Sequence, residues 1–288
     1  MSAAPLMPQV STDRPARRGR PNPSLLIGTV LVAAVALCCL LSFVWTPYDP
    51  TVVDASVRLQ GPSAAHWLGT DNFGHDVFSA ILVGSRTSLF VGVVAVAVAA
   101  VIGIPLGVAA GITDRRAGRW LMRWNDIMQA FPALLLAIIF GAVFGAGTLT
   151  AMIALGIGTA PAFARIARSG TLQVMSREYI AASRAAGRGG WFMAVRHVLP
   201  NIAGVLIVQA SVNFAVAVLA EAALSYLGLG TPPPTPSWGR MLQEAQTHIF
   251  GNPLLTVWPG VAIALTVLGF NLLGDGLRDR LDPRSERR

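Results

Sequence analysis

Long apolar stretches alternate along the chain with shorter segments that carry nearly all of its charge. A helix needs about 20 apolar residues to cross roughly 30 Å of hydrocarbon, so each stretch of that length predicts one membrane-spanning helix. Four stretches have the length for a single crossing. They are residues 24–45, 87–112, 201–220 and 253–274.

The stretch 127–164 is uncharged over 38 residues, which is too long for one crossing. Its middle holds a small, flexible run at 145–148 (Gly-Ala-Gly-Thr) that suits a tight turn. We therefore expect two spans here, at about 127–144 and 149–166. The whole pattern predicts an all-α membrane protein with six transmembrane helices, because lipid leaves no partner for unpaired backbone groups.

The first apolar stretch follows an arginine-rich tail, as the core of a secretory signal peptide would. Its apolar core is too long for a signal peptide, and the run Val44-Trp45-Thr46-Pro47 offers no small-residue cleavage site. We expect an uncleaved span, preceded by a disordered tail over 1–23 that contains five prolines.

Composition favours a membrane protein over a soluble fold. Hydrophobic residues make up 53% of the 288 residues, the mean hydropathy is +0.58, and only 12% of residues are charged. Soluble proteins average about 25% charged residues. The net charge of +8 would suit nucleic acid, but arginine-rich cytoplasmic loops account for it in a membrane protein, so we expect no nucleic-acid partner. All 22 basic residues are arginine, which excludes a P-loop lysine and Schiff-base chemistry.

The arginines are divided unevenly between alternate connections. Nineteen of the 22 lie in the segments 1–23, 113–126, 165–200 and 275–288. The other connections hold only Arg58, Arg86 and Arg240. Six spans with both termini in the cytoplasm satisfy the positive-inside rule throughout, and 113–126 is then an arginine-rich cytoplasmic connection.

The cytoplasmic loop at about 167–200 predicts a helix-turn-helix. Tyr179–Ala186 is rich in alanine, and glycines at 187, 189 and 190 end it, with a positive φ expected at the turn. A second short helix, Trp191–Leu199, precedes Pro200. Two interpretations remain open from the residues alone: a docking element for another subunit, or a solvated arginine-rich loop that rests on lipid headgroups.

The spacing in this loop resembles the cytoplasmic signature of ABC importer permeases. Ala181-Ala182, Gly187 and Leu199-Pro200 keep its register, while Ala181 stands where the signature often has Glu and His197 stands at an Ile position. We expect His197 to be a loop or interface residue rather than a catalyst. The resemblance implies an ATPase-coupling loop formed by Glu178, Tyr179, Ala181, Ala182, Arg184, Ala185, Gly187, Leu199 and Pro200.

Six further motifs, in order along 24–284, resemble the C-type subunit of dipeptide and oligopeptide permeases. Their positions are 66–71 with 74 and 76–79, 84–89, 130–132 with 134–137, 221–230, 233–239, and 274–275 with 278–279 and 281–283. One position departs, because His75 follows Gly74 where that family usually has Arg. Seven motifs in the same order make the resemblance specific.

The resemblance implies a type I ABC importer permease core of five spans preceded by one extra span. The implied organisation is a cytoplasmic tail (1–23), a first helix with an external loop (24–85), the permease domain (86–275) and a second cytoplasmic tail (276–288). The implied location is the bacterial plasma (inner) membrane, with the lipid bilayer as surroundings.

The same resemblance implies the partners and the activity. They would be a second homologous permease, cytoplasmic ATPase subunits that bind ATP and magnesium, and an extracytoplasmic substrate-binding protein. This chain would form half of the pore, hold no cofactor or metal and catalyse no reaction. Short peptides are the expected cargo, and nickel complexes, glutathione and haem are the alternatives within the family.

Three polar residues of the fifth span are candidates for the translocation path. Gln209 and Asn213 precede Glu221 by twelve and eight residues, which places all three on roughly one side of a helix. They either face the path between two permeases or form hydrogen bonds with neighbouring helices.

Two rival functions remain. A self-contained secondary transporter needs ionisable relay residues in the middle of the membrane, and only Glu221 comes close. An intramembrane enzyme needs catalytic groups that converge at one depth, and none do. In the first external loop, His66 and His75 accompany Asp71 and Asp76, for which we expect a solvated turn network rather than a metal site.

Overall fold

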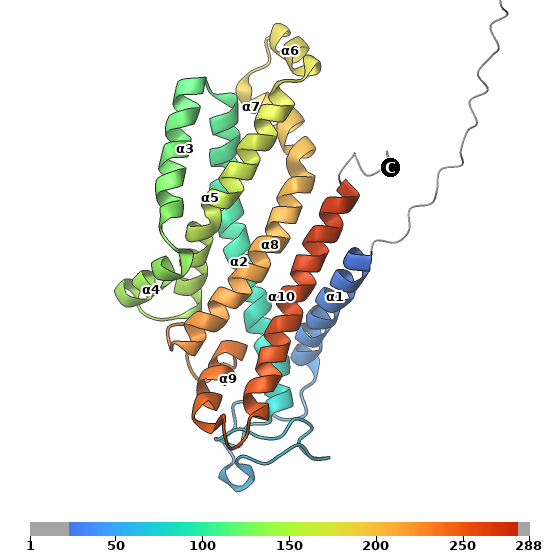
Figure 1. Cartoon of the computed structure of the whole chain (residues 1–288), viewed down its shortest axis with the longest axis vertical. Helices are drawn as coiled ribbons and strands as arrows, with labels where there is room; N and C mark the ends of the chain where they lie inside the picture. Colours follow the sequence, from blue (N-terminus) through green and yellow to red (C-terminus); the bar gives the residue numbers. More distant parts are fainter. Residues whose placement is uncertain (1–22, 282–288) are drawn as a thin grey trace, which may run out of the picture.

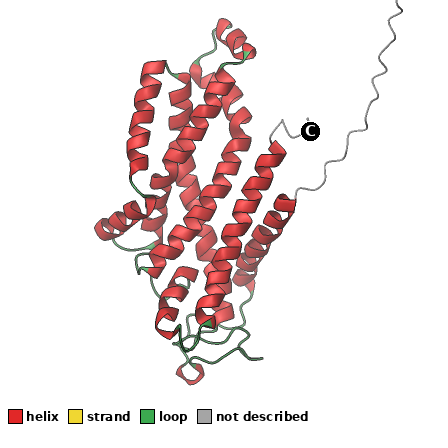
Figure 2. Cartoon of the chain, in the orientation of Figure 1, coloured by secondary structure: helices red, strands yellow, loops and turns green. Residues whose placement is uncertain are grey.

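The computed structural model describes residues 23–281, so the tail that we predicted to be disordered lies outside the described residues except for Pro23. Helices joined by loops make up this part, and no strand occurs within it (Figure 2). The helices of more than three residues are α1 (Pro23–Val44), α2 (Val77–Ile112), α3 (Arg115–Ala130), α4 (Ala133–Phe144), α5 (Thr148–Met175), α6 (Glu178–Ala185), α7 (Gly190–Met193), a π-helical turn η2 (Ala194–Val198), α8 (Leu199–Tyr226), α9 (Trp238–Ala245) and α10 (Leu254–Leu281).

The predicted all-α membrane architecture is confirmed. Within the described residues, five helices are long and apolar enough to cross a membrane, and a bent pair of helices makes a sixth span if it is counted as one. The five are Pro23–Val44, Val77–Ile112, Thr148–Met175, Gly190–Tyr226 and Leu254–Leu281. Figure 1 shows them running along one common direction.

Helix α3 occupies most of the segment that we expected to be a connection (113–126), so that expectation is wrong. Asp114 begins the helix by accepting a hydrogen bond from the backbone N–H of Ala117 at 2.9 Å. The helix is amphipathic: it buries Gly118, Met122 and Asn125 and leaves its arginines exposed. A search for uncharged stretches overlooks such a helix, because half of its surface is polar.

The predicted straight span over 127–144 is instead the junction of α3 and α4, whose axes are bent by 75°. Phe131 lies between them in an extended conformation (φ −83°, ψ 122°). The residue before a proline is disfavoured in the helical region, and Pro132 has no N–H to continue the helix. The Phe-Pro pair therefore explains the bend.

Several other helix boundaries differ from those predicted from apolar length. α2 begins ten residues before the expected position 87, because Asp76 caps it by accepting the backbone N–H of Ser79 at 2.8 Å. α10 continues to Leu281, so six residues of the predicted tail 276–288 belong to a helix and 282–288 lie outside the described residues. Helices thus extend past the apolar stretches into polar flanks.

The core of the bundle depends on small residues that let helix backbones approach closely. A Cβ atom at Gly103 or Gly107 of α2 would collide with the carbonyl oxygen of Ala160 or Ala164 in α5. Any larger residue at these two positions would push the two helices apart.

The first span packs against the last one. A Cβ atom at Gly28 of α1 would collide with the backbone of Leu273 in α10, and one at Gly276 would collide with Leu25. The beginning of α1 and the end of α10 therefore lie at the same end of the bundle, as Figure 1 shows.

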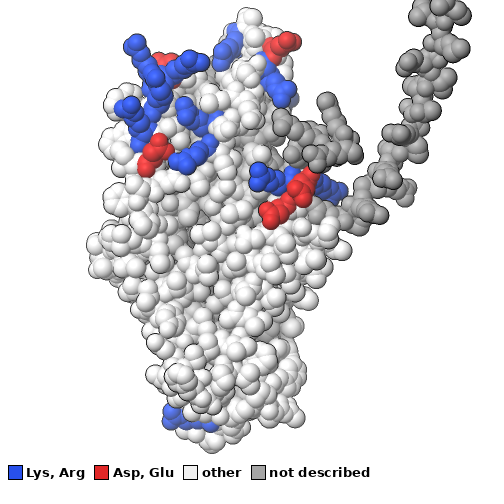
Figure 3. Space-filling model, viewed as in Figure 1, with Lys and Arg blue, Asp and Glu red and all other residues white. Residues whose placement is uncertain are grey.

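The two ends of the molecule differ in their content of charged residues. In Figure 3, arginine and acidic side chains gather at the end where α3 begins, α6 lies and α10 ends, and the middle of the visible face is free of charge. We call this end the arginine-rich end. The opposite end, which we call the loop end, is formed by residues 45–76 and by α9.

Candidate functional site

Helix α6 projects beyond α5 and α8 at the arginine-rich end (Figure 1). One side chain of α6 is buried, that of Ile180, which is fully enclosed in a cluster with Val174, Met193 and Val198. The other residues that we predicted for this helix and its turn are exposed: Glu178, Tyr179, Ala181, Ala182, Arg184, Ala185 and Gly187. The geometry is that of a short helix held at one point and free to contact another surface.

The turn after α6 has the positive φ that we expected at Gly187, with a value of 75°. The N–H of Gly187 donates to the carbonyl of Arg184 at 2.9 Å, and the N–H of Arg188 donates to the carbonyl of Ser183 at 3.2 Å. This pair of bonds is the Schellman arrangement that ends many helices. The turn is therefore fixed by the backbone and requires the left-handed conformation.

The second helix of the predicted helix-turn-helix is not a separate element, which corrects our expectation. The helix runs without a break from Gly190 through Tyr226, so Leu199 and Pro200 lie in the first turn of α8. The N–H of Leu199 donates to the carbonyl of Ala194, five residues earlier, in a π-helical turn. Pro200 cannot donate to the carbonyl four residues before it, and the widened turn accommodates that missing bond.

His197 lies in this π-helical turn and contacts two aromatic rings. The ring of Tyr179 in α6 is 5.7 Å from the His197 ring, centre to centre, and the ring of Phe192 is 5.6 Å away, edge on. The carbonyl of His197 accepts a hydrogen bond from the side chain of Asn201 at 2.7 Å. The imidazole thus joins α6 to the base of α8, a role that the sequence reasoning missed; its only signal was His at an Ile position.

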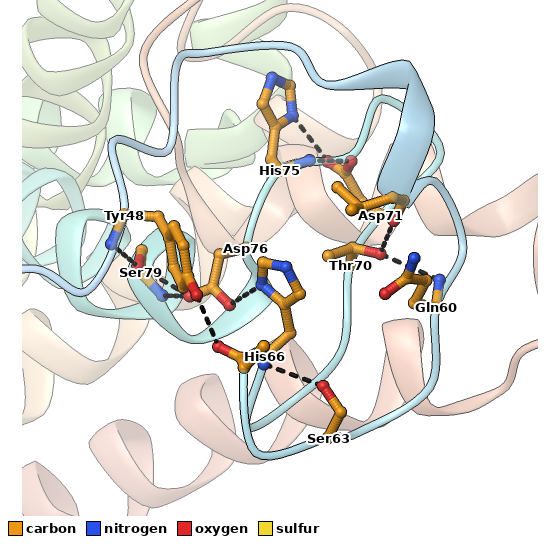
Figure 4. A network of polar contacts seen from close by, with 11 residues as sticks. Tyr48, Gln60, Ser63, His66, Thr70, Asp71, His75, Asp76 and Ser79 are labelled. Atoms are coloured by element: carbon orange, nitrogen blue, oxygen red, sulfur yellow. Dashed lines mark hydrogen bonds and ion pairs between the residues drawn. The ribbon is translucent and has the colours of Figure 1, made fainter.

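The loop end contains the expected histidine–aspartate network, drawn in Figure 4. His66 Nδ1 is 3.0 Å from Asp76 Oδ1, and the other carboxylate oxygen of Asp76 accepts a hydrogen bond from the hydroxyl of Ser79, in the first turn of α2. The ring of Tyr48 lies against that of His66 at a tilt of 35° with ring centres 4.7 Å apart, and the Tyr48 hydroxyl donates to the carbonyl of Ala65. We expected a solvated network, but His66 is only 8% exposed. The His66–Asp76 pair is therefore a buried contact between the loop and α2, whereas Tyr48 at its edge is exposed.

A second pair in the same loop joins His75 Nδ1 to Asp71 Oδ2 at 2.8 Å. Nearby, Asp54 begins a short turn by accepting from the hydroxyl and backbone N–H of Ser56, and these hydrogen bonds lower the pKa of the Asp54 carboxyl. Among residues 23–281, no group of three or more His, Cys, Asp or Glu side chains has the arrangement needed to hold a metal ion.

The three candidate path residues fall into two separate groups. The side-chain amide of Gln209 donates to the side-chain oxygen of Asn213 at 2.8 Å, within α8. Glu221 is 1% exposed and accepts from the hydroxyls of Ser225 at 2.6 Å and Thr231 at 3.3 Å. Glu221 therefore joins the end of α8 to the loop that follows it.

That loop is also attached to other helices at the loop end. Thr148, the first residue of α5, donates to the hydroxyl of Thr231 at 3.3 Å. The indole N–H of Trp238 donates to the carbonyl of Ile81 in α2 at 3.0 Å, and Thr87 of α2 donates to the carbonyl of Pro236 at 3.0 Å. Movement of α8 relative to α2 or α5 must strain or break these contacts.

A family model described as "Binding-protein-dependent transport system inner membrane component" matches residues 103–287. Among curated proteins, a dipeptide transport system permease protein of Alkalihalophilus pseudofirmus is 41% identical over 263 residues, which covers 91% of this chain and 86% of that protein. A glutathione transport system permease protein of Pectobacterium atrosepticum is 44% identical over 239 residues, covering 83% and 79%. A probable D,D-dipeptide transport system permease protein of Escherichia coli is 38% identical over 291 residues, covering 97% and 98%.

Among solved structures, an inward-facing form of the MetNI methionine ABC transporter is similar with a TM-score of 0.59. The match covers 70% of this chain and 97% of that chain at 21% sequence identity. At this identity the likeness concerns the fold of the helical bundle.

Proposed function

The chain belongs to the family of binding-protein-dependent transport system inner membrane components, and on that basis we propose that it is the pore-forming permease subunit of an ATP-driven importer of short peptides. The observation that carries this proposal is the helix α6 with its Gly187 turn, which projects beyond α5 and α8 at the arginine-rich end. Ala181, Ala182 and Gly187 of the ABC coupling signature fall on α6 and its turn, while Leu199 and Pro200 of the same signature begin α8.

We assign ATP hydrolysis, with its magnesium, to a partner subunit. This chain has no lysine for a nucleotide-binding P-loop. The partner would contact the exposed residues Glu178, Tyr179, Ala181, Ala182, Arg184, Ala185 and Gly187, while Leu199 and Pro200 set the base from which α8 continues. A displacement of α6 then reaches α8 through Ile180 and through the ring contacts of His197.

The arginine-rich end is assigned to the cytoplasm by the positive-inside rule, in a bacterial inner membrane. The packing of α1 on α10 supports this assignment, because it brings the first and last described residues to that same end. Both termini are then cytoplasmic, and the loop end faces the extracytoplasmic binding protein. Residues 46–76 and α9 offer that partner an ordered surface.

A second, homologous permease would complete the pore, and the translocation path would lie between the two permeases. Gln209, Asn213 and Glu221 remain our candidates for that path, in different roles. Gln209 and Asn213 present amide groups within α8, whereas Glu221 holds the loop that closes the extracytoplasmic side.

Short peptides are the proposed cargo because relatives over most of this chain are named for dipeptides. Glutathione is the second candidate, since one relative of 44% identity is named for it and it is itself a small peptide. Nickel complexes and haem have no support from the relatives named above.

The test is uptake by the reconstituted complex. The permease pair, ATPase subunits and binding protein are placed in vesicles, and labelled dipeptide, tripeptide and glutathione are supplied separately with ATP inside. The proposal expects peptide uptake that stops without ATP or without the binding protein. Uptake that persists without the ATPase subunits would instead identify a secondary transporter, and uptake of glutathione alone would replace the peptide assignment.

A further inference from the structure

A stripe of arginine, tryptophan and apolar side chains follows one face of α3. Successive helix residues are turned by about 100°, so positions 116, 119, 120, 123, 124 and 127 fall on one side of the helix axis. The buried residues Gly118, Met122 and Asn125 fall on the other side. We use the name α3 stripe for Arg116, Arg119, Trp120, Arg123, Trp124 and Ile127.

The first part of the α3 stripe, from Arg116 to Arg123, is rich in arginine. Arg116, Arg119 and Arg123 line a shallow concavity together with Trp120, and the guanidinium of Arg123 lies 5.2 Å from the centre of the Trp120 ring. Within residues 23–281 none of these three arginines forms an ion pair; the only acidic residue of α3, Asp126, pairs with an arginine of α5 at 3.0 Å. Guanidinium groups with free N–H donors match the geometry of phosphate oxygens.

The tryptophans and Ile127 give the α3 stripe an apolar, exposed surface that continues past Arg123. Trp120 and Trp124 are 63% and 67% exposed, and Ile127 is 53% exposed. From Arg116 to Ile127 the helix rises about 16 Å, which is enough to pass from the headgroups into the acyl chains of a bilayer. Tryptophan is the residue typical of the boundary between these two layers.

The α3 stripe thus begins with arginines, which suit a charged headgroup, and ends with Trp124 and Ile127, which suit acyl chains. We propose that the α3 stripe binds an anionic phospholipid, with its phosphate among Arg116, Arg119 and Arg123 and its acyl chains along Trp124 and Ile127. Charge complementarity selects an anionic headgroup, and the apolar continuation selects a lipid over a free anion. The proposal requires the first turns of α3 to lie at the depth of the headgroups, and it does not depend on the cargo.

The test measures retained lipid on the whole complex. The complex is reconstituted in nanodiscs of phosphatidylcholine with a varied fraction of phosphatidylglycerol, and retained phosphatidylglycerol is counted by native mass spectrometry. A basic residue beside an anionic surface changes binding by about fivefold, so the variant Arg116→Gln/Arg119→Gln/Arg123→Gln should bind this lipid roughly 100-fold more weakly. A charge-matched variant, Arg177→Gln/Arg278→Gln/Arg280→Gln, should retain it.

Two further measurements separate the lipid from other occupants. Trp124→Ala leaves the charge unchanged and should still reduce retention, and excess inorganic phosphate should not displace the lipid. Equal loss in both triple variants, displacement by phosphate, or absence of retained phosphatidylglycerol on the wild type would overturn the proposal. Efficient cross-linking of a cysteine at position 120 to a partner subunit would also overturn it, because the stripe would then be a protein interface.

Discussion

Replacing Gly187 by valine should weaken ATPase association or abolish stimulated ATP hydrolysis while leaving the protein in the membrane. Gly187 holds a φ of 75°, which β-branched residues strongly disfavour. No atom lies within 4 Å of a Cβ atom built at this position, so the effect is conformational and not a clash. A forced left-handed residue costs about 1–2 kcal/mol, which lowers the population of the native turn by about 5–30-fold.

A cost of this size is small compared with the free energy that inserts the helical bundle in the membrane, and large compared with the free energy that holds the turn. Six apolar spans still insert, so the amount of protein in the membrane should stay at the wild-type level. The turn, however, depends on two backbone hydrogen bonds, from Gly187 and Arg188, that require the left-handed conformation. When it opens, α6 loses its fixed direction and presents a different surface to the ATPase.

The assay is ATP hydrolysis by the purified complex, with and without loaded binding protein, together with subunit stoichiometry. Gly187→Val should weaken ATPase association or abolish the stimulation by binding protein and peptide. Gly187→Asn should have a smaller effect, because asparagine tolerates positive φ better than valine does.

Gly189→Val is the matched control. Gly189 has an ordinary φ of −75°, and no atom lies within 4 Å of its would-be Cβ atom, so the same substitution two residues away should behave like the wild type. Full stoichiometry and normal stimulated hydrolysis in Gly187→Val would refute the reasoning. So would an equal loss in Gly189→Val, because the effect would then arise from side-chain bulk in the loop.

Three further predictions follow from other contacts. His197→Ala should weaken the attachment of α6 by about 0.5–1.5 kcal/mol per lost ring contact. Stimulated ATP hydrolysis should then fall more than the yield of the complex. A loss of yield alone would indicate a purely structural role for His197. Glu221→Gln should lower the free energy of unfolding of the complex, followed by thermal denaturation, by about 1–2 kcal/mol, because the Glu221 carboxylate accepts hydrogen bonds from protein hydroxyls. Cargo preference should not change; an altered preference at normal yield would identify Glu221 as a cargo ligand. On a background without native cysteines, an impermeant thiol reagent outside the cell should label a cysteine at position 58 and not at position 18, and the reverse would refute the topology.

The apolar pattern predicted the number of helical spans well, because burial in lipid demands long uncharged helices whatever their neighbours. It failed at α3, whose arginines hide a helix that is half buried against α2 and α5. It also placed one straight span across Phe131 and Pro132, where the backbone bends by 75°. A proline disfavours a continuous helix, and apolar length alone takes no account of Pro132.

The candidate site was predictable where a single residue determines the local backbone. Gly187 was expected to have a positive φ, and it has one. The partners of Glu221 were not predictable, because Thr231 reaches it through a loop whose path depends on contacts with α2 and α5. The role of His197 depends on the π-helical turn, which rotates side chains relative to a regular helix and so defeats a count of 100° per residue.

The position of Ile180 supports our proposal that the short helix α6 transmits movement to the bundle. Its side chain is fully buried among Val174 of α5 and Met193 and Val198, which lead into α8. Tertiary contacts of α6 with the bundle are therefore concentrated at one end of two long helices. A force on the exposed face of α6 acts on both helices at once through this point, and the ring contact of Tyr179 with His197 limits its rotation. At the loop end, the same two helices are joined through Thr148, Thr231 and Glu221, so a tilt that begins at α6 must act on those hydrogen bonds. In our proposal, a force from the ATPase acts on α6 and reaches these hydrogen bonds through α5 and α8, which approach each other closely where Gly170 meets Ile202.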